Sequence, residues 1–310
     1  DDDSTSVSEP SAQPLSSAST AAPVPPPDAA AITAVGVGLH HACALRRDGT
    51  VWCWGSEAPI YGADHDDKPG LALQPVPVPG LPRARDLYVK RQNNCIVDEE
   101  GQLYCWGTGH GVAPVPNLTE VRDVAMGSDP CAITPTGVTC WDDRHPDDQY
   151  LVLGRRDLVG IDAEVDRVCA LTDDGKVYCW KHSRHPQRLE PIGTIGDATS
   201  LAVATHEACV THASGSVSCW RHGRSNAVPK RVEAVTGAVQ VAVGNSHACS
   251  RTVVGAVACW GSERATRTPI EPDAGRRVAG IAAAWDIDAD QDATCAASPM
   301  GAVCGGRALG

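Results

Sequence analysis

Short apolar runs alternate with polar turns along most of this chain, and that spacing predicts β-strands. Seven segments share one pattern: an apolar run, a turn with glycine, and a second run rich in Val, Tyr and Trp. Two strands joined by a tight turn produce this pattern, so each segment predicts a β-hairpin. Glycine suits such turns because it takes a positive φ without a steric penalty. The seven turn glycines are Gly49, Gly101, Gly137, Gly175, Gly215, Gly255 and Gly301.

Each hairpin is flanked by further apolar segments. An apolar stretch precedes it, as at 34–38 and 278–284, and a segment with Pro and Val follows it, as at 74–80. Each unit thus supplies about four strands, which we letter A to D in chain order. Seven such units of roughly 40 residues predict an all-β fold, a seven-bladed β-propeller of four-stranded blades.

The two ends of the repeat array complement each other. The last unit stops soon after its third strand, whereas residues 22–26 resemble the passage from strand D to strand A in a later unit. We expect this N-terminal strand to complete the last blade, which removes an open sheet edge. The predicted organisation is therefore a disordered leader at 1–21 and a single propeller at 22–310.

Fourteen cysteines fall into seven pairs, one pair in each hairpin. The members of a pair are 9 or 10 residues apart, and residues that flank a tight turn lie opposite each other on antiparallel strands. Free thiols are the alternative; zinc is disfavoured because C-x2-C spacing is absent. We predict one disulfide in each blade, joining Cys43–Cys53, Cys95–Cys105, Cys131–Cys140, Cys169–Cys179, Cys209–Cys219, Cys249–Cys259 and Cys295–Cys304.

A tryptophan follows the second cysteine in six of the seven units. Its regular place in the repeat predicts a core role, packing between neighbouring blades, rather than ligand stacking. The residues are Trp54, Trp106, Trp141, Trp180, Trp220 and Trp260.

The best-conforming units read VGLHHACALRRDGTVWCWG and VGNSHACSRTVVGAVACWG. They resemble the repeat of the regulator of chromosome condensation type, G-x-x-H-[AST]-C-A-L…D-G-x-[VL]-[WY]-C-W-G. The resemblance covers nearly all of 22–310, although the family's N-x-x-G-Q-L-G signature is absent from every unit. Members include a nuclear guanine-nucleotide exchange factor, a plant light receptor and a secreted bacterial β-lactamase inhibitor. The resemblance implies protein binding through the ring, mostly without catalysis, and suggests a bacterial secreted or lipoprotein-like member.

Disulfides and charge narrow the setting. Seven disulfides indicate an oxidising compartment: secreted, periplasmic or at the outer cell surface. Residues 1–30 are rich in Ser, Ala, Pro and Asp and lack aromatic, Lys and Arg residues, which is a linker composition. A tether to a lipid anchor at a processed N-terminus and a leader without function both fit it. No apolar run is long enough for a transmembrane segment. The net charge of −12 argues against a nucleic-acid partner.

Loop lengths suggest where a partner would bind. The B–C turns are short, whereas the C–D segments vary, including 56–73, 142–157, 181–188 and 221–230. Variable loops on a rigid scaffold commonly carry binding function, so we expect the face formed by the A–B and C–D connections to bind a protein partner. The candidate binding residues on this face are Tyr61, His65, Tyr150, His182, His222 and Trp285.

Alternating carboxylates near the C-terminus resemble part of a calcium loop. We assign this run, Asp286, Asp288, Asp290 and Asp292, to a long last A–B connection. Gln291 and Ala297 stand where an EF-hand has Gly and Glu, so a weak, irregular Ca²⁺ site and a solvated acidic loop both fit. No other cofactor is indicated.

No catalytic motif is present: the chain lacks G-x-S-x-G, H-E-x-x-H and a phosphate-binding glycine loop. The sequence therefore predicts a non-enzymatic, extracytoplasmic scaffold or interaction module. Two alternatives fit the same residues: a propeller that binds or cleaves an envelope polysaccharide, and a secreted enzyme inhibitor resembling the propeller-type β-lactamase inhibitor.

Overall fold

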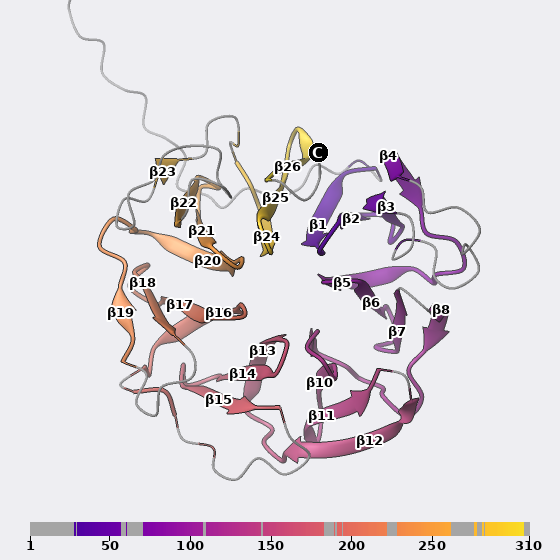
Figure 1. The fold of residues 1–310 in the computed structure, drawn as a ribbon, viewed down its shortest axis with the longest axis horizontal. Helices are drawn as coiled ribbons and strands as arrows, with labels where there is room; N and C mark the ends of the chain where they lie inside the picture. Colours follow the sequence, from indigo (N-terminus) through magenta and orange to yellow (C-terminus); the bar gives the residue numbers. More distant parts are fainter. Residues whose placement is uncertain are drawn as a thin grey trace, which may run out of the picture.

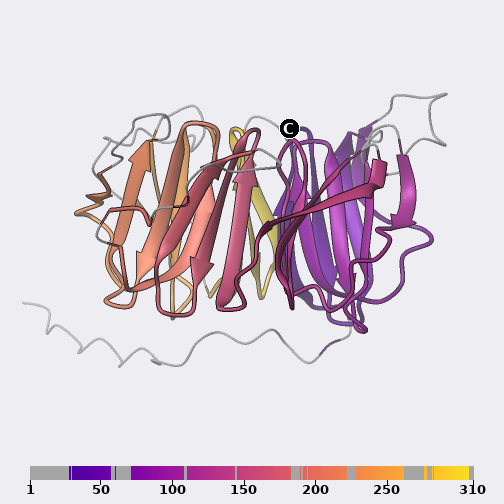
Figure 2. The same ribbon diagram turned by 90° about the horizontal axis from the view of Figure 1, so that it is seen from below.

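The strands of this chain form a ring of seven antiparallel sheets around a central axis (Figures 1 and 2). The computed structural model describes residues 28, 30–56, 60, 71–107, 110–143, 145–182, 189, 191–193, 195–221, 228–261, 276–277, 281 and 283–306. The leader expected at 1–21 and the closing strand expected at 22–26 lie outside these residues. No helix in the described ranges is long and apolar enough to span a membrane.

Each sheet is one blade, and its first strand lies nearest the axis. Blade 1 holds β1 (Ile32–Val37), β2 (His41–Arg46), β3 (Val51–Ser56) and β4 (Leu71–Pro77). Blade 2 holds β5 (Ala84–Lys90), β6 (Asn93–Asp98), β7 (Leu103–Gly107) and β8 (His110–Pro114). Blade 3 holds β9 (Asp123–Ala125), β10 (Cys131–Thr134), β11 (Gly137–Asp142) and β12 (His145–Leu153).

The second half of the ring continues this order. Blade 4 holds β13 (Leu158–Glu164), β14 (Arg167–Thr172) and β15 (Val177–Lys181). Blade 5 holds β16 (Ala198–Val203), β17 (Glu207–His212), β18 (Val217–Arg221) and β19 (Lys230–Arg231). Blade 6 holds β20 (Ala238–Val243), β21 (His247–Thr252), β22 (Val257–Gly261) and β23 (Arg276–Arg277). Blade 7 holds β24 (Asp286–Asp290), β25 (Ala293–Ser298) and β26 (Gly301–Gly306).

The prediction of four strands in every blade is only partly right. Blades 4 and 7 have three strands each within the described residues. In blade 4 the outer segment makes a single bridge, between Tyr178 and Pro191, because the chain there does not stay extended beside β15. In blade 7 the fourth strand was expected from residues 22–26, outside the described ranges.

The predicted hairpins and disulfides are confirmed. In all seven blades the two cysteines are direct partners in the register of the second and third strands, with Cα atoms 3.9–4.1 Å apart. All seven turn glycines have positive φ, from 77° at Gly215 and Gly255 to 129° at Gly137. No cysteine is free.

The tryptophans fill the seams between blades, as predicted. Trp106 of blade 2 is fully buried and packs with Leu45 and Val51 of blade 1. The same relation recurs around the ring, since each tryptophan belongs to a core cluster that includes the preceding blade. The others are Trp141 with blade 2, Trp180 with blade 3, Trp220 with blade 4, Trp260 with blade 5 and Trp54 with blade 7.

Two loop assignments were wrong. The run from Asp286 to Asp290 is not an A–B connection but strand β24, whereas the apolar stretch expected as this strand, 278–284, precedes it. Alternation of Asp with Ile and Ala has the period of a strand with one polar side. Residues 142–157 are not a long C–D loop either, because β12 occupies 145–153 and pairs with β11 through Tyr150 and Cys140.

Blade 7 closes the ring against blade 1. Ala293 and Ala297 pack with Val35 and Val37 in one core cluster. The Trp285 indole N–H donates to the backbone oxygen of Ile32 over 3.0 Å. The ends of the described ring are therefore held by packing and hydrogen bonds.

Candidate functional site

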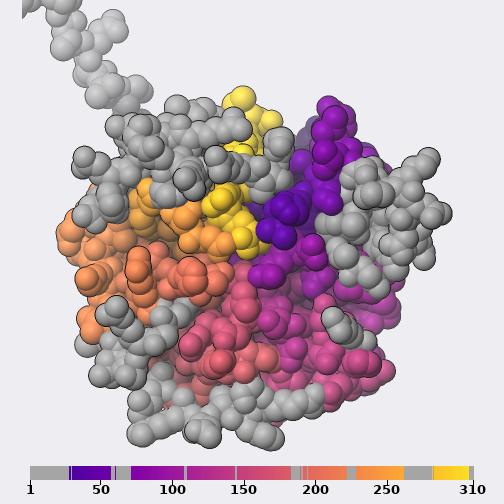
Figure 3. All heavy atoms as spheres, viewed as in Figure 1, coloured from indigo at the N-terminus to yellow at the C-terminus, as the bar shows by residue number. Residues whose placement is uncertain are grey.

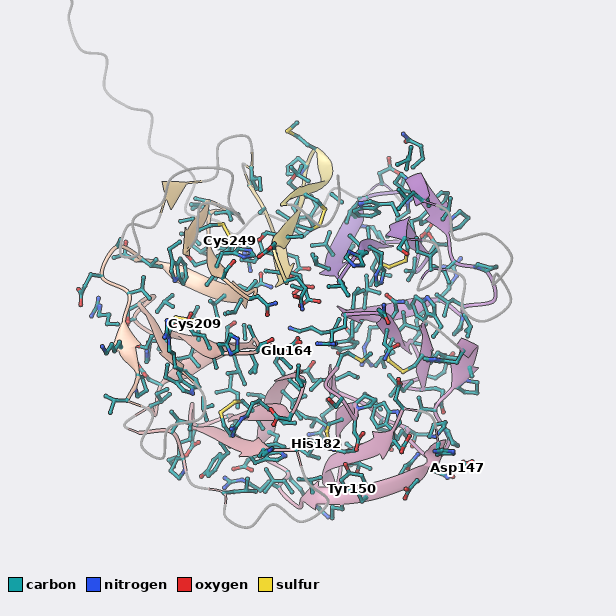
Figure 4. All side chains as sticks on the ribbon, in the orientation of Figure 1. Asp147, Tyr150, Glu164, His182, Cys209 and Cys249 are labelled. Carbon is teal, nitrogen blue, oxygen red and sulfur yellow. A yellow bond between two sulfur atoms is a disulfide. The ribbon has the colours of Figure 1, made fainter. Side chains whose placement is uncertain are left out.

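Two of the predicted binding residues, Tyr150 and His182, meet on the A–B/C–D face. His182 follows β15 in the C–D connection of blade 4, and Tyr150 lies on β12 of blade 3 (Figure 4). The Tyr150 hydroxyl is 2.7 Å from His182 Nε2 and donates to Asp129 Oδ2 over 3.0 Å. His182 Nε2 is also 2.7 Å from Asp129 Oδ2. These three residues form what we call the Tyr–His–Asp cluster.

The cluster is preorganised and partly open. The side chain of His182 is 14% exposed and that of Asp129 is 33% exposed, and every member is fixed by two hydrogen bonds. Together with His182, the sulfurs of Cys131 and Cys140 form the only group of three potential metal ligands within 4.8 Å in the described chain. Those sulfurs are joined as a disulfide, so they are not thiolate ligands. The cluster is suited to contact a partner rather than to hold a metal.

The remaining predicted contacts divide into two groups. Tyr61, His65 and His222 lie outside the described residues. Trp285 is described, but it packs into the seam between blades 7 and 1 and bonds Ile32. Its role is structural, because its polar nitrogen is already used inside the ring.

Two buried histidines join neighbouring blades near the same face. His41 Nε2 is 2.7 Å from Asn94 Oδ1 of blade 2, and His247 Nε2 is 2.6 Å from Thr294 Oγ1 of blade 7. Burial lowers the pKa of each to about 4. Both are therefore neutral structural groups at neutral pH rather than pH-responsive surface residues.

A second site lies on the ring axis. The seven inner strands β1, β5, β9, β13, β16, β20 and β24 enclose a cavity of about 260 Å³. Seen down the axis, atoms of several blades close over the ring centre (Figure 3). We call the space between the inner strands the channel.

Side chains in the channel hold each blade to the next. The inner edge of an innermost strand has backbone N–H groups without a strand partner, and buried donors need acceptors. A polar side chain of the preceding blade supplies the acceptor. The pairs are Asp123 with Ile161, Asp162 with Val203, Ser200 with Val241, Gln240 with Ile287, Asp286 with Val35 and Asp288 with Val37, over 2.6–3.3 Å.

Five residues from three blades form a charged group at the A–B end of the channel. We call this group the hub: Lys90, Arg91, Asp162, Glu164 and Asp290. Lys90 Nζ donates to the Val203 oxygen over 3.2 Å and lies 3.7 Å from Glu164 and 4.0 Å from Asp162. Arg91 donates to Glu164 Oε1 over 3.2 Å, and its backbone N–H donates to Asp290 over 2.9 Å. The hub thus links blades 2, 4, 5 and 7 across the axis.

Burial sets the protonation of the channel. It raises the pKa of Asp123 and of Asp288 to about 7, against the hydrogen bonds that lower both. Burial also raises the pKa of Asp162, Glu164 and Asp286. For Lys90 burial acts in the opposite direction, but the nearby carboxylates outweigh it and raise the pKa. The ammonium therefore stays charged among carboxyl groups that are strained toward neutrality.

Sequence reasoning missed the channel residues Lys90, Asp123, Asp162 and Glu164. A signal was present: in each inner strand, polar residues recur at every second position counted from the partner of the first cysteine, as Asp162 pairs with Cys169 and Asp288 with Cys295. The acidic run was found, but its carboxylates accept backbone N–H groups of blades 1 and 2 instead of converging in a loop.

Comparisons with known proteins agree with this architecture. The family model described as regulator of chromosome condensation (RCC1) repeat matches residues 32–58, which include β1, β2 and β3. No curated protein matches the sequence.

Solved structures share the fold at low identity. Saccharomyces cerevisiae Prp20p has 17% identity and a TM-score of 0.64, with 79% of this chain and 76% of that chain covered. Human WBSCR16 has 16% identity and a TM-score of 0.67, with 84% and 85% covered. The CRINKLY WD40 ectodomain of the Arabidopsis thaliana receptor kinase ACR4 has 23% identity and a TM-score of 0.60, with 90% and 96% covered. The chain is thus a seven-bladed β-propeller whose first blade carries an RCC1 repeat.

Proposed function

We propose that this protein is a non-catalytic, extracytoplasmic module that binds a protein partner through its A–B/C–D face. The observation that carries the proposal is the Tyr–His–Asp cluster, which presents an aromatic side chain fixed by polar neighbours at a partly open seam. Fixed, amphipathic aromatic residues are frequent anchors in protein interfaces because little side-chain entropy is lost on binding.

Proteins of similar fold support a binding role. The Prp20p structure was described together with the binding of that protein to Gsp1p and histones. RCC1-type propellers are typically interaction modules, although the partner of this chain has to differ, since its net charge of −12 disfavours nucleic acid. The cluster and the acidic surface favour a protein partner with complementary basic groups.

The disulfides support an oxidising location. Seven bonds, one in each blade, are rare in a reducing cytosol, and the similar ACR4 structure is a receptor ectodomain. We place the protein outside the cytoplasm: secreted, periplasmic or on the outer cell surface. Residues 1–21 serve in this proposal as a polar tether, to which a lipid anchor is one form of attachment.

Replacement of the cluster tests the face. A Tyr150→Ala/His182→Ala double variant should lose the partner recovered by cross-linking and mass spectrometry on intact cells. Arg122→Ala is the control, because Arg122 is exposed beside the D–A end of blade 3. Circular dichroism on each variant verifies folding. Equal recovery by the folded double variant and by the control would contradict this face.

A further inference from the structure

The channel is a cavity with one closed end. Its lining begins at Asp123 and Asp286, the first residues of β9 and β24, and ends at Lys90. The hub occupies the A–B end beyond that point. The cavity therefore reaches the side of the ring that carries the B–C turns and D–A connections, which is opposite the face proposed for the protein partner.

Negative groups outnumber positive ones around this cavity. Lys90, Arg91 and Arg251 are the cations, and Arg251 already donates to Gln240 over 2.9 Å. The side chain of Arg91 is 48% exposed at the hub, so Lys90 is the one cation that both lines the cavity and is buried among the described residues. Six carboxyl groups face them: Asp123, Asp162, Glu164, Asp286, Asp288 and Asp290.

One buried oxygen in this group has no hydrogen bond. The side chain of Glu164 is 1% exposed, and its Oε2 atom has no donor, since Lys90 Nζ is 3.7 Å away. Figure 4 shows Glu164 directed toward the ring centre. An unpaired buried carboxylate oxygen costs free energy that an added N–H donor recovers.

The donor set does not suit a metal ion. In the described residues the carboxylate oxygens of the channel do not form a group of three ligands within 4.8 Å, whereas Ca²⁺ and Mg²⁺ require several oxygens in one shell. Dispersed carboxylates along a narrow space fit an elongated organic cation, whose N–H groups donate at separate points.

We propose that the channel binds an alkylammonium group, such as an amine of a polyamine or the side chain of a lysine, which enters from the B–C/D–A side. The cavity lining, the excess of carboxyl groups and the free Glu164 oxygen carry this assignment.

Binding should release protons. At neutral pH, Asp123 and Asp288, whose pKa values are about 7, are partly protonated, and a cation favours the ionised forms. The groups that face the cavity and titrate with them come from β5 (Tyr88 and Lys90), β13 (Asp162 and Glu164) and β24 (Asp286 and Asp290), beside Arg251 of β21. Affinity for an ammonium ion should therefore rise as the pH increases from 6 to 8.

Titration calorimetry with spermidine tests the proposal on the whole chain at low salt. We expect binding that is at least tenfold tighter at pH 8 than at pH 6, with a heat that depends on the buffer because protons are released. A second arm uses a lysine-containing peptide; tighter binding of one ligand identifies the source of the ammonium group. Absence of binding by both ligands would overturn the proposal.

Matched variants locate the site. Asp288→Asn and Asp123→Asn each retain an oxygen that accepts the neighbouring backbone N–H, and each should weaken spermidine binding about tenfold. Glu100→Gln removes one exposed carboxylate from a B–C turn and should bind as the wild type does. Equal weakening in all three variants, or equal competition by MgCl₂ at the same ionic strength, would show general charge screening and contradict the channel. Melting curves confirm that each variant is folded.

Discussion

Single buried groups determine how this ring responds to pH. His41 and His247 have pKa values lowered to about 4, so the folded state binds fewer protons than the unfolded state below pH 6.5. Asp123 and Asp288 have pKa values raised to about 7, so the folded state binds more protons than the unfolded state above pH 4. The two pairs shift stability in opposite directions over the same window.

The histidine contribution can be isolated with His41→Gln. Wild-type stability is complete above pH 6.5 and falls as the pH approaches 4, by up to about 3 kcal/mol for this residue. Glutamine can donate to Asn94 but does not titrate, so the variant should lose less stability over pH 7 to 4.5. Urea unfolding across this range measures the difference. His145→Gln, at a side chain that is 76% exposed, is the control and should follow the wild type.

The carboxyl contribution has the opposite sign. The pKa of Asp288 is raised to about 7 in the folded state, so ionisation destabilises the ring as the pH rises. Asp288→Asn should raise the melting temperature by several degrees at pH 8 and have little effect at pH 4. A variant that is less stable than the wild type at pH 8 would show that the carboxylate charge itself is required at the blade 7 seam.

Sequence alone reveals those residues whose role is local. Cys43, Cys53 and Gly49 lie within one hairpin, so their spacing suffices to predict the disulfide and the turn. Lys90 and Glu164 were not found, because they meet across the axis from blades separated by 73 residues. Their function depends on the curvature of the ring, which no local pattern records. Tyr150 and His182 were predicted separately, but their contact depends on the same geometry.

At the scale of the element, the outer strands were the hardest to predict. The inner three strands of each blade carry cysteine, glycine and tryptophan at fixed spacing. The outer strands carry no such marker: β12 was taken for a loop, and blade 4 has only a bridge at Pro191. An edge strand contacts the rest of the sheet on one side, so its sequence is less constrained.

The tryptophans are the element that joins one blade to another. Trp106→Ala removes a fully buried side chain from the seam of blades 1 and 2, and we expect a loss of about 3–5 kcal/mol. Thermal unfolding followed by circular dichroism measures it. Trp52→Ala is the comparison, since Trp52 lies partly exposed under Arg46, 3.8 Å from its ring, and should cost clearly less. Equal losses would show that the seam is not specially dependent on Trp106.

For the whole molecule, stability is divided among seven similar staples. Each disulfide closes a loop of about ten residues, worth roughly 2–3 kcal/mol in a chain-entropy model, and the hairpin already holds its ends together. We expect the Cys169→Ala/Cys179→Ala variant to fold with a modestly lower melting temperature, whereas reduction of all seven bonds should greatly lower it. Peptide mapping without reductant should show links only within hairpins. Unfolding of the whole ring by the single-pair variant would contradict shared stabilisation.

The contacts of β24 have a consequence for biosynthesis. Asp286, Asp288 and Asp290 accept backbone N–H groups from Val35, Val37 and Arg91, which are translated about 200–250 residues earlier. During synthesis the first two blades therefore wait with these donors uncapped until the final blade emerges. The nascent ring is most prone to wrong association in that interval, and a chaperone that shields β1 would be most useful then.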